Sequence, residues 1–292
     1  MKRIYMAVVL LLIAISGFSQ TDTTQKEGNI DTIKVGNFII IKKNKPGSGS
    51  SNDNEKHDNK HVTVNINFSN GDKNKKPSRI STNWLIFDLG FANYQDKTNY
   101  TAALAKGYID SKRPVGSNSL ELNGGKSSNV NIWFFMQKLD VAKKVINLKY
   151  GLGLEMYNFR FANNVSYRNG PVPTIFTDSV NFSKDKLYAS YLTIPLMVNI
   201  NTKPCSNKAF SFSAGVSAGY LIGSRNKQIS NERGKQKFNG PFQLNPFRLA
   251  AIGEIGVGSV RLYGSYSLNT LHKESTGLEQ YPFAIGVRFS KW

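Results

Sequence analysis

The stretch at residues 208–223, KAFSFSAGVSAGYLIG, decides the fold of this 292-residue chain. Apolar side chains occupy every second position, from Phe210 and Phe212 to Tyr220 and Ile222. The positions between them, from Ser211 onward, hold Ser, Gly and a single Leu. Because successive side chains point to opposite faces of a β-strand, the stretch predicts a strand with one apolar face and one face of small, mostly polar residues.

The same alternation recurs along the chain, which predicts an all-β protein. The eight predicted strands are residues 85–91, 130–137, 145–161, 187–200, 208–223, 247–257, 260–269 and 281–289. Most are near the roughly 9 to 11 residues with which a tilted strand crosses a bilayer. The connections alternate between long and short, which is typical of barrels with long extracellular loops and short periplasmic turns. The predicted fold of residues 82–292 is therefore an eight-stranded antiparallel transmembrane β-barrel.

A soluble β-sandwich or a lipocalin-like barrel is the alternative, with the apolar faces in a shared core and the polar faces in water. The regular alternation of loop lengths favours the membrane barrel, and so do the Gly, Ser and Ala residues that suit a narrow lumen. Aromatic residues also lie near the segment ends, as in interfacial girdles. Examples are Trp84, Tyr94, Tyr220 and Phe247.

Residues 1–19 have the three parts of a secretory signal peptide. Lys2 and Arg3 precede an apolar run over residues 4–15, and Gly17 and Ser19 supply small residues before cleavage between Ser19 and Gln20. A membrane-spanning helix needs about 20 apolar residues, so the run is too short for an anchor. The mature chain is therefore expected to be exported to the outer membrane of a Gram-negative cell.

Residues 20–81 are dominated by Lys, Asn, Asp, Ser and Gly, and they predict a polar, mostly flexible periplasmic extension. Within it, residues 32–35 and 38–41 predict a short β-hairpin around Gly36 and Asn37. HVTVNINF at 61–68 could add a third strand. Because the number of barrel strands is even, both termini are expected in the periplasm.

The net charge of +19 is spread along the chain rather than gathered in one basic block. An exported chain is not expected to bind nucleic acid, whereas outer-membrane lipid, lipopolysaccharide above all, carries phosphate. The third long loop, residues 224–245, concentrates basic residues that could contact this lipid. The loop residues are Arg225, Lys227, Arg233, Lys235 and Lys237. A solvated loop without a ligand is the alternative, and the sequence leaves it open.

Charged residues of both signs are predicted on the inward faces of the strands. They are Asp88, Lys149, Glu155, Arg248, Glu254, Arg261 and Arg288. A charge in a narrow, partly dry lumen must be paired, since its desolvation otherwise costs several kcal/mol. We therefore expect an ion network that plugs the lumen. A charged constriction that selects ions is the alternative, although side chains about fill the interior of an eight-stranded barrel.

No catalytic residue and no cofactor is expected. His272 lies near Glu274, Ser275 and Glu279 at the start of the last long loop, a set of residue types that could cleave lipid acyl chains at the barrel rim. Nothing in the sequence places these side chains together, so they are interpreted as ordinary loop residues.

A metal site is not expected either. His57 and His61 lie four residues apart in the polar extension, but no third ligand accompanies them. Cys205 is the one cysteine of the chain and cannot form an intramolecular disulfide.

Four short stretches of the barrel region resemble the PorT-type outer-membrane β-barrel domain proteins. They are YLTIPL at 191–196, YGLGLE at 150–155, NPFR at 245–248 and YPFAIG at 281–286. The first is the most specific. The resemblance implies an eight-stranded outer-membrane barrel without enzymatic activity or a shared ligand, and some family members serve secretion and gliding machinery. Barrel proteins often end on an aromatic residue that the assembly machinery recognises, and here Phe289 or Trp292 could be that residue.

Taken together, these features predict a non-catalytic outer-membrane protein with a structural or interaction role in scaffolding, adhesion or secretion. Its expected partners are outer-membrane lipid, the barrel-assembly machinery during biogenesis, and a periplasmic or extracellular protein. The alternative function is a lipid-modifying enzyme at the rim or a narrow channel for small solutes.

Overall fold

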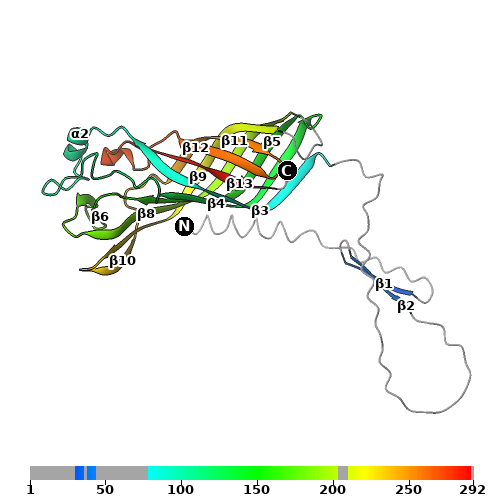
Figure 1. Cartoon of the computed structure of the whole chain (residues 1–292), viewed down its shortest axis with the longest axis horizontal. Coiled ribbons are helices and arrows are strands. Elements are labelled where there is room, and N and C mark those ends of the chain that lie inside the picture. Colours follow the sequence, from blue (N-terminus) through cyan, green and yellow to red (C-terminus); the bar gives the residue numbers. More distant parts are fainter. Residues whose placement is uncertain (1–29, 36–37, 44–77, 203–209, 291–292) are drawn as a thin grey trace, which may run out of the picture. The chain divides into compact units, whose positions relative to one another are not determined.

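The computed structural model describes residues 30–35, 38–43, 78–202 and 210–290, and the chain divides into two units, Met1–Pro77 and Ser78–Trp292 (Figure 1). Several sequence expectations lie outside the described residues: the signal peptide, the strand at 61–68, His57, His61, Cys205 and Trp292. In the described ranges, no helix is both long and apolar enough to cross a membrane.

The first unit contains a β-hairpin. Strands β1 (Ile30–Val35) and β2 (Phe38–Lys43) pair antiparallel, with Val35 opposite Phe38 and Ile30 opposite Lys43. The two strands are thus joined by two residues, Gly36 and Asn37, which is the commonest length of a hairpin connection.

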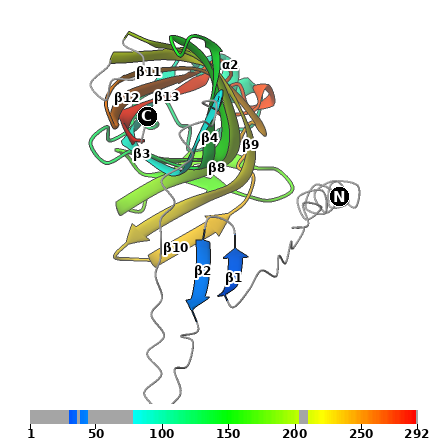
Figure 2. The same ribbon diagram turned by 90° about the vertical axis from the view of Figure 1, so that its right-hand side faces the viewer.

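The second unit is built on a closed ring of eight strands. The ring strands are β3 (Ile80–Asp96), β4 (Ser128–Ala142), β5 (Ile146–Arg160), β8 (Phe182–Asn201), β9 (Phe210–Ser230), β11 (Phe247–Val257), β12 (Val260–Ser267) and β13 (Gln280–Phe289). Each pairs antiparallel with its neighbour, and β13 returns to pair with β3 (Figure 2). The prediction of eight antiparallel strands in a barrel is therefore confirmed.

Five short elements complete the second unit. They are α2 (Tyr100–Ala105), β6 (Val165–Arg168), β7 (Thr174–Thr177), β10 (Gly234–Asn239) and the 3₁₀ turn η1 (Glu274–Thr276). Asn99 begins α2 by accepting a hydrogen bond at its side-chain oxygen from the backbone N–H of Ala102, as N-cap residues do.

Apolar side chains cover the outside of the ring. In β8, every second residue from Leu192 to Ile200 is exposed, while those between them, from Thr193 to Asn199, are buried in the lumen. The other ring strands contribute further exposed apolar residues. They are Trp84, Phe87, Leu89, Phe91, Phe134, Ile146, Phe210, Phe212, Val216, Tyr220, Ile222, Phe247, Leu249, Ile255, Val257, Val260, Leu262, Ile285 and Phe289. We call this set, with its β8 members, the apolar belt.

The alternation of residues 130–137 predicts Met136 outward, in line with Val130, Ile132 and Phe134, and Gln137 inward. Both directions are wrong: Met136 is fully buried and packs with Trp133 and Met197 inside the ring, and Gln137 is only partly buried. The register of β4 against β5 shifts between Trp133 and Phe135, so β4 carries a bulge there. An extra residue inverts the face of every side chain beyond it, which turns Met136 inward.

The prediction of a loop over residues 224–245 is also wrong for its first part, residues 224–230, which belong to a strand. Strand β9 continues to Ser230 and then folds back as β10, with Gly234 opposite Ser230 and Lys237 opposite Lys227. The inward residues of this extension have polar partners. For example, the Gln228 amide donates to the backbone carbonyl of Val165 at 2.9 Å.

The long connections at one end of the ring pack together into a cap. We define the cap as residues 97–127, 161–181, 231–246 and 268–279, the segments that join the ring strands at the end carrying α2. Tyr108, Ile109, Tyr167, Ile175 and Phe242 from three of these segments form one buried core that continues into the ring. The connections are therefore an ordered layer over the lumen rather than separate loops.

Candidate functional site

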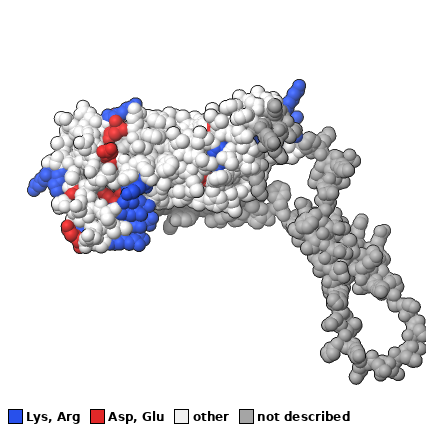
Figure 3. All heavy atoms as spheres, in the orientation of Figure 1, with Lys and Arg blue, Asp and Glu red and all other residues white. Residues whose placement is uncertain are grey.

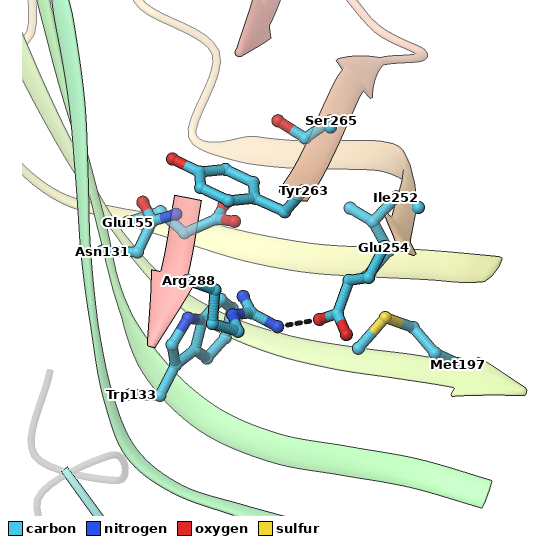
Figure 4. A pocket seen from close by; sticks show the side chains of 11 residues that line it. Asn131, Trp133, Glu155, Met197, Ile252, Glu254, Tyr263, Ser265 and Arg288 are labelled. Atoms are coloured by element: carbon cyan, nitrogen blue, oxygen red, sulfur yellow. Dashed lines mark hydrogen bonds and ion pairs between the residues drawn. The ribbon is translucent and has the colours of Figure 1, made fainter. Parts of the chain in front are cut away.

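Arg288 is the centre of the charged cluster inside the ring. It lies directly opposite Asp88 in the pairing of β13 with β3 and binds that carboxylate through Nε and Nη2, both at 2.7 Å. Its third nitrogen, Nη1, pairs with Glu254 of β11, to which Figure 4 shows it pointing. The guanidinium lies between aromatic rings, 5.0 Å from the centroid of Trp133 and 5.8 Å from that of Tyr263. Arg288 thus joins two carboxylates across the lumen.

Each of these two carboxylates has further donors. The Lys149 ammonium forms a buried ion pair with Glu254. Asp88 accepts hydrogen bonds from the Trp133 indole at 2.7 Å and from the Asn131 amide at 3.1 Å. A buried charge is stable only when it is paired and its remaining hydrogen-bonding sites are satisfied, and this cluster meets both conditions.

A second ion pair lies in the lumen. Arg248 of β11 pairs with Glu155 of β5 at 2.6 Å and donates from Nε to the Ser267 hydroxyl at 2.9 Å. Glu155 also accepts from the Thr193 hydroxyl at 3.3 Å. The small polar side chains of the inward faces therefore serve as hydrogen-bond partners of the buried charges.

Arg261, the remaining residue of the predicted network, lies near the turn between β11 and β12. It donates to the Ser290 hydroxyl and to the Gly258 carbonyl at 3.4 Å. Its stem packs over Gly256, where a Cβ atom would come within 2.5 Å of the Arg261 Cγ. Of the seven predicted residues, the structure thus joins six in ion pairs and places the seventh at this turn.

Side chains fill most of the lumen. A small cavity lies beside the cluster, lined by residues that include Asn131, Glu155, Met197, Ile252 and Ser265 (Figure 4). Its free space is about that of one water molecule. Ile86, Trp133, Met136 and Met197 form an apolar plug next to it. This arrangement holds the paired charges in a crowded interior with little room for water.

The structure does not bring the predicted rim set together. His272 is buried in the cap, where its ring stacks on Tyr167 with 6.2 Å between centroids, whereas Glu274, Ser275 and Glu279 are exposed. Within the described residues, no hydrogen bond joins the imidazole to any of the three. His272 lies in the connection between β12 and β13, as the sequence predicts, but the sequence did not predict its burial among the cap residues. Among the described residues, no three His, Cys, Asp or Glu side chains gather into a metal site.

The predicted lipid-contact residues separate into two groups. Arg225 and Lys227 of β9 and Lys235 and Lys237 of β10 lie in one antiparallel sheet. Arg233 lies in the turn between these strands and is held there by an ion pair of 3.0 Å with the buried Asp178, which follows β7.

Sequence reasoning missed two features of this region. The first is the set of cap residues around Tyr108, Tyr167 and Phe242, whose segments showed no regular period. The second is that Arg160 of β5 and Lys186 of β8 lie beside Lys227. The even spacing of Lys186 from Leu192 could have placed both on one face of the strand, but cross-strand neighbours depend on register.

Residues 63–273 match the family described as outer membrane protein beta-barrel domain. This chain belongs to that family. The matched region contains the ring from β3 to β12, and β13 follows it. No curated protein matches the chain.

Proposed function

We propose that residues 78–290 span the outer membrane as a closed, non-catalytic barrel and that the cap is its contact surface for a partner protein. The role is structural or interactive, in scaffolding, adhesion or secretion. The apolar belt is the observation that carries the proposal. Soluble monomers rarely expose apolar patches larger than a few hundred Å², whereas lipid-facing strands carry an apolar band of this kind.

The lumen supports the non-conducting part of the proposal. Three carboxylates and three cations are joined there in ion pairs, and aromatic and methionine side chains occupy much of the remaining space. In water-filled barrels the interior is wide and polar. A plugged interior is better suited to a rigid support for surface structures than to transport.

The proposal also covers export, the position of the termini, the PorT-type assignment and the partners. The signal peptide and the even number of ring strands favour export and a periplasmic position of both termini. The YLTIPL stretch, now located at the start of the lipid-facing part of β8, supports the PorT-type assignment and a secretion-associated role. The barrel-assembly machinery would be a partner during biogenesis, and a periplasmic or extracellular protein a partner afterwards.

Topology labelling tests the proposal. Three variants of the full chain, each made in a Cys205→Ser background, place one cysteine in the β6–β7 connection (Val172→Cys), in the belt (Leu196→Cys) or beside the β4–β5 turn (Val141→Cys). All three native side chains are exposed, at 70%, 49% and 65%. With a membrane-impermeant maleimide on intact cells, we expect only position 172 to react. Position 141 should react after the outer membrane is permeabilised.

Position 196 is the decisive one. In lipid its thiol cannot ionise and stays unreactive with the polar reagent in either preparation. Labelling of position 196 as fast as of position 172 would mean that the belt faces water, and the membrane-spanning proposal would be wrong. Labelling of position 141 in intact cells would mean that the barrel has the opposite orientation in the membrane.

A further inference from the structure

Four basic residues lie side by side on four adjacent strands. Arg160 of β5 is opposite Lys186 of β8, Lys186 is opposite Lys227 of β9, and Lys227 is opposite Lys237 of β10. We call these four residues the basic row. Adjacent strands are about 4.8 Å apart, so the row is about 15 Å long. Residues directly opposite each other share a face of the sheet, which places all four charges on one surface.

The basic row faces outward, above the apolar belt. In β8, Lys186 has the same parity as the exposed Leu192, while the residues of opposite parity, such as Leu187, are buried. In β9, the register shift beside Ser190 turns the odd-numbered residues outward beyond the belt. The row lies four residues above Ser190, which is about 13 Å along the strand. It is therefore at the height of the lipid headgroups if the belt is at the height of the acyl chains.

Further cations surround the basic row. Lys184 and Lys235 lie next to it on the same face, both beside Ile229, and Arg225 lies on its belt side over the ring of Tyr188 at 5.4 Å. Figure 3 shows Lys and Arg gathered near this end of the barrel, next to a wide uncharged surface.

No carboxylate of the described residues forms an ion pair with any member of the row. The Lys186 ammonium donates to the Asn158 amide oxygen at 2.6 Å, and Arg160 donates to the Ser183 carbonyl at 2.6 Å. Partial desolvation and then the charges of Lys184, Lys227, Arg225 and Arg160 lower the pKa of Lys186. Like charges placed directly opposite each other destabilise a sheet, and proteins keep such violations mainly where a function needs them.

We propose that the basic row binds the phosphate groups of outer-leaflet glycolipid, the lipid A part of lipopolysaccharide. The charge is complementary, and the site lies directly above the belt, so one lipid can place its acyl chains on the belt and its phosphates on the row. This inference rests on the proposed function, since it needs the belt to lie in the membrane.

The test measures lipid binding by the full chain in nanodiscs. The variant is Lys186→Gln, Lys227→Gln and Lys237→Gln together. The matched control removes three exposed cap lysines outside the row, by Lys112→Gln, Lys126→Gln and Lys273→Gln. Labelled bisphosphorylated lipid A is the probe. We expect the row variant to bind about tenfold more weakly and the control to bind within about twofold of the native chain.

Two further probes distinguish the source of the phosphate. Lipid A without phosphates should bind the native chain and the row variant equally weakly. Inorganic phosphate should not compete at concentrations that exceed the lipid by about a hundredfold, because it lacks the contacts with the belt. Three results would each overturn the inference. The native chain could bind both lipids equally, the row variant and the control could lose affinity for lipid A equally, or free phosphate could compete fully.

The maleimide pattern of positions 172, 196 and 141 separates this inference from the proposed function. If the pattern is as expected and lipid binding does not depend on the row, only the inference fails. If position 196 labels freely, the proposed function fails first.

Discussion

Arg248 and Glu155 form a buried ion pair. Removing only one of the two charges should destabilise the barrel more than removing both. Removing one partner leaves the other charge in a dry lumen, which typically costs about 3–5 kcal/mol. We expect Arg248→Met to lower the free energy of unfolding by about this amount. The measurement is urea unfolding of the barrel in phospholipid vesicles, followed by tryptophan fluorescence.

The double variant Arg248→Met with Glu155→Gln is the control. It removes both charges, so we expect it to recover much of the stability that the single variant loses. If the single variant unfolds like the native protein, the lumen is more hydrated than the ion pairs imply, and the plugged interior would be in doubt.

His272 predicts a pH dependence of the cap. Burial lowers the pKa of His272 to about 4 from its ordinary value of 6.5, against a smaller opposing effect of Gln280 and Asp96. A depressed histidine pKa means that the folded cap prefers the neutral ring. The contribution to stability is therefore complete above pH 6.5 and decreases as the pH falls toward 4, by about 3 kcal/mol in total.

The contribution of Asp185 to stability has the opposite pH dependence, so the experiment replaces this residue. Burial raises the pKa of Asp185 to about 7 from 3.8, so its contribution is complete below pH 3.8 and is lost as the pH rises through 7. In an Asp185→Asn background, we expect the hydrogen-bonded amides of Ile175 and Leu244, which donate to the carbonyls of Tyr108 and Pro241, to lose hydrogen-exchange protection between pH 6.5 and 4. Adding His272→Phe, which keeps the ring stacking, should preserve that protection. An identical loss with and without His272 would assign the effect to another group.

At the scale of the strand, close backbone contacts restrict particular glycines. A Cβ atom on Gly153 would lie 2.6 Å from the Ile132 carbonyl oxygen and 2.6 Å from Cε3 of Trp133. Gly253 of β11 has no atom nearer than the Ser213 oxygen at 3.8 Å. We expect Gly153→Ala to destabilise the barrel by about 1–3 kcal/mol and Gly253→Ala to be neutral or slightly stabilising, both measured by urea unfolding. Equal effects would mean that the close contact of β4 with β5 relaxes freely.

The strands also show how far a sequence predicts such a fold. Period-two alternation located all eight ring strands, because each has one face in the apolar belt and one in the lumen. It failed at Met136, since a bulge is an extra residue that leaves no mark in composition. It also failed at residues 224–230, where the strand leaves the belt and its outward residues become basic rather than apolar.

At the scale of the whole molecule, closure of the ring determines which inward charges form ion pairs. The inward charges could be predicted from the alternation, but their partners could not. Glu254 pairs with both Lys149 and Arg288, which lie on strands far apart in the sequence. The basic row has the same origin, because the register of four strands brings its members together. Function is least predictable of all, since a partner is recognised by the assembled surface.

Planar-bilayer recording of the full chain tests the central claim, a closed barrel that spans the outer membrane. Insertion is first verified by the protection of position 196 in the same membranes. We then expect no steady conductance above that of the protein-free bilayer, because ion pairs and the Trp133 plug fill the lumen. Steady, reproducible channel openings of the native chain would contradict the account.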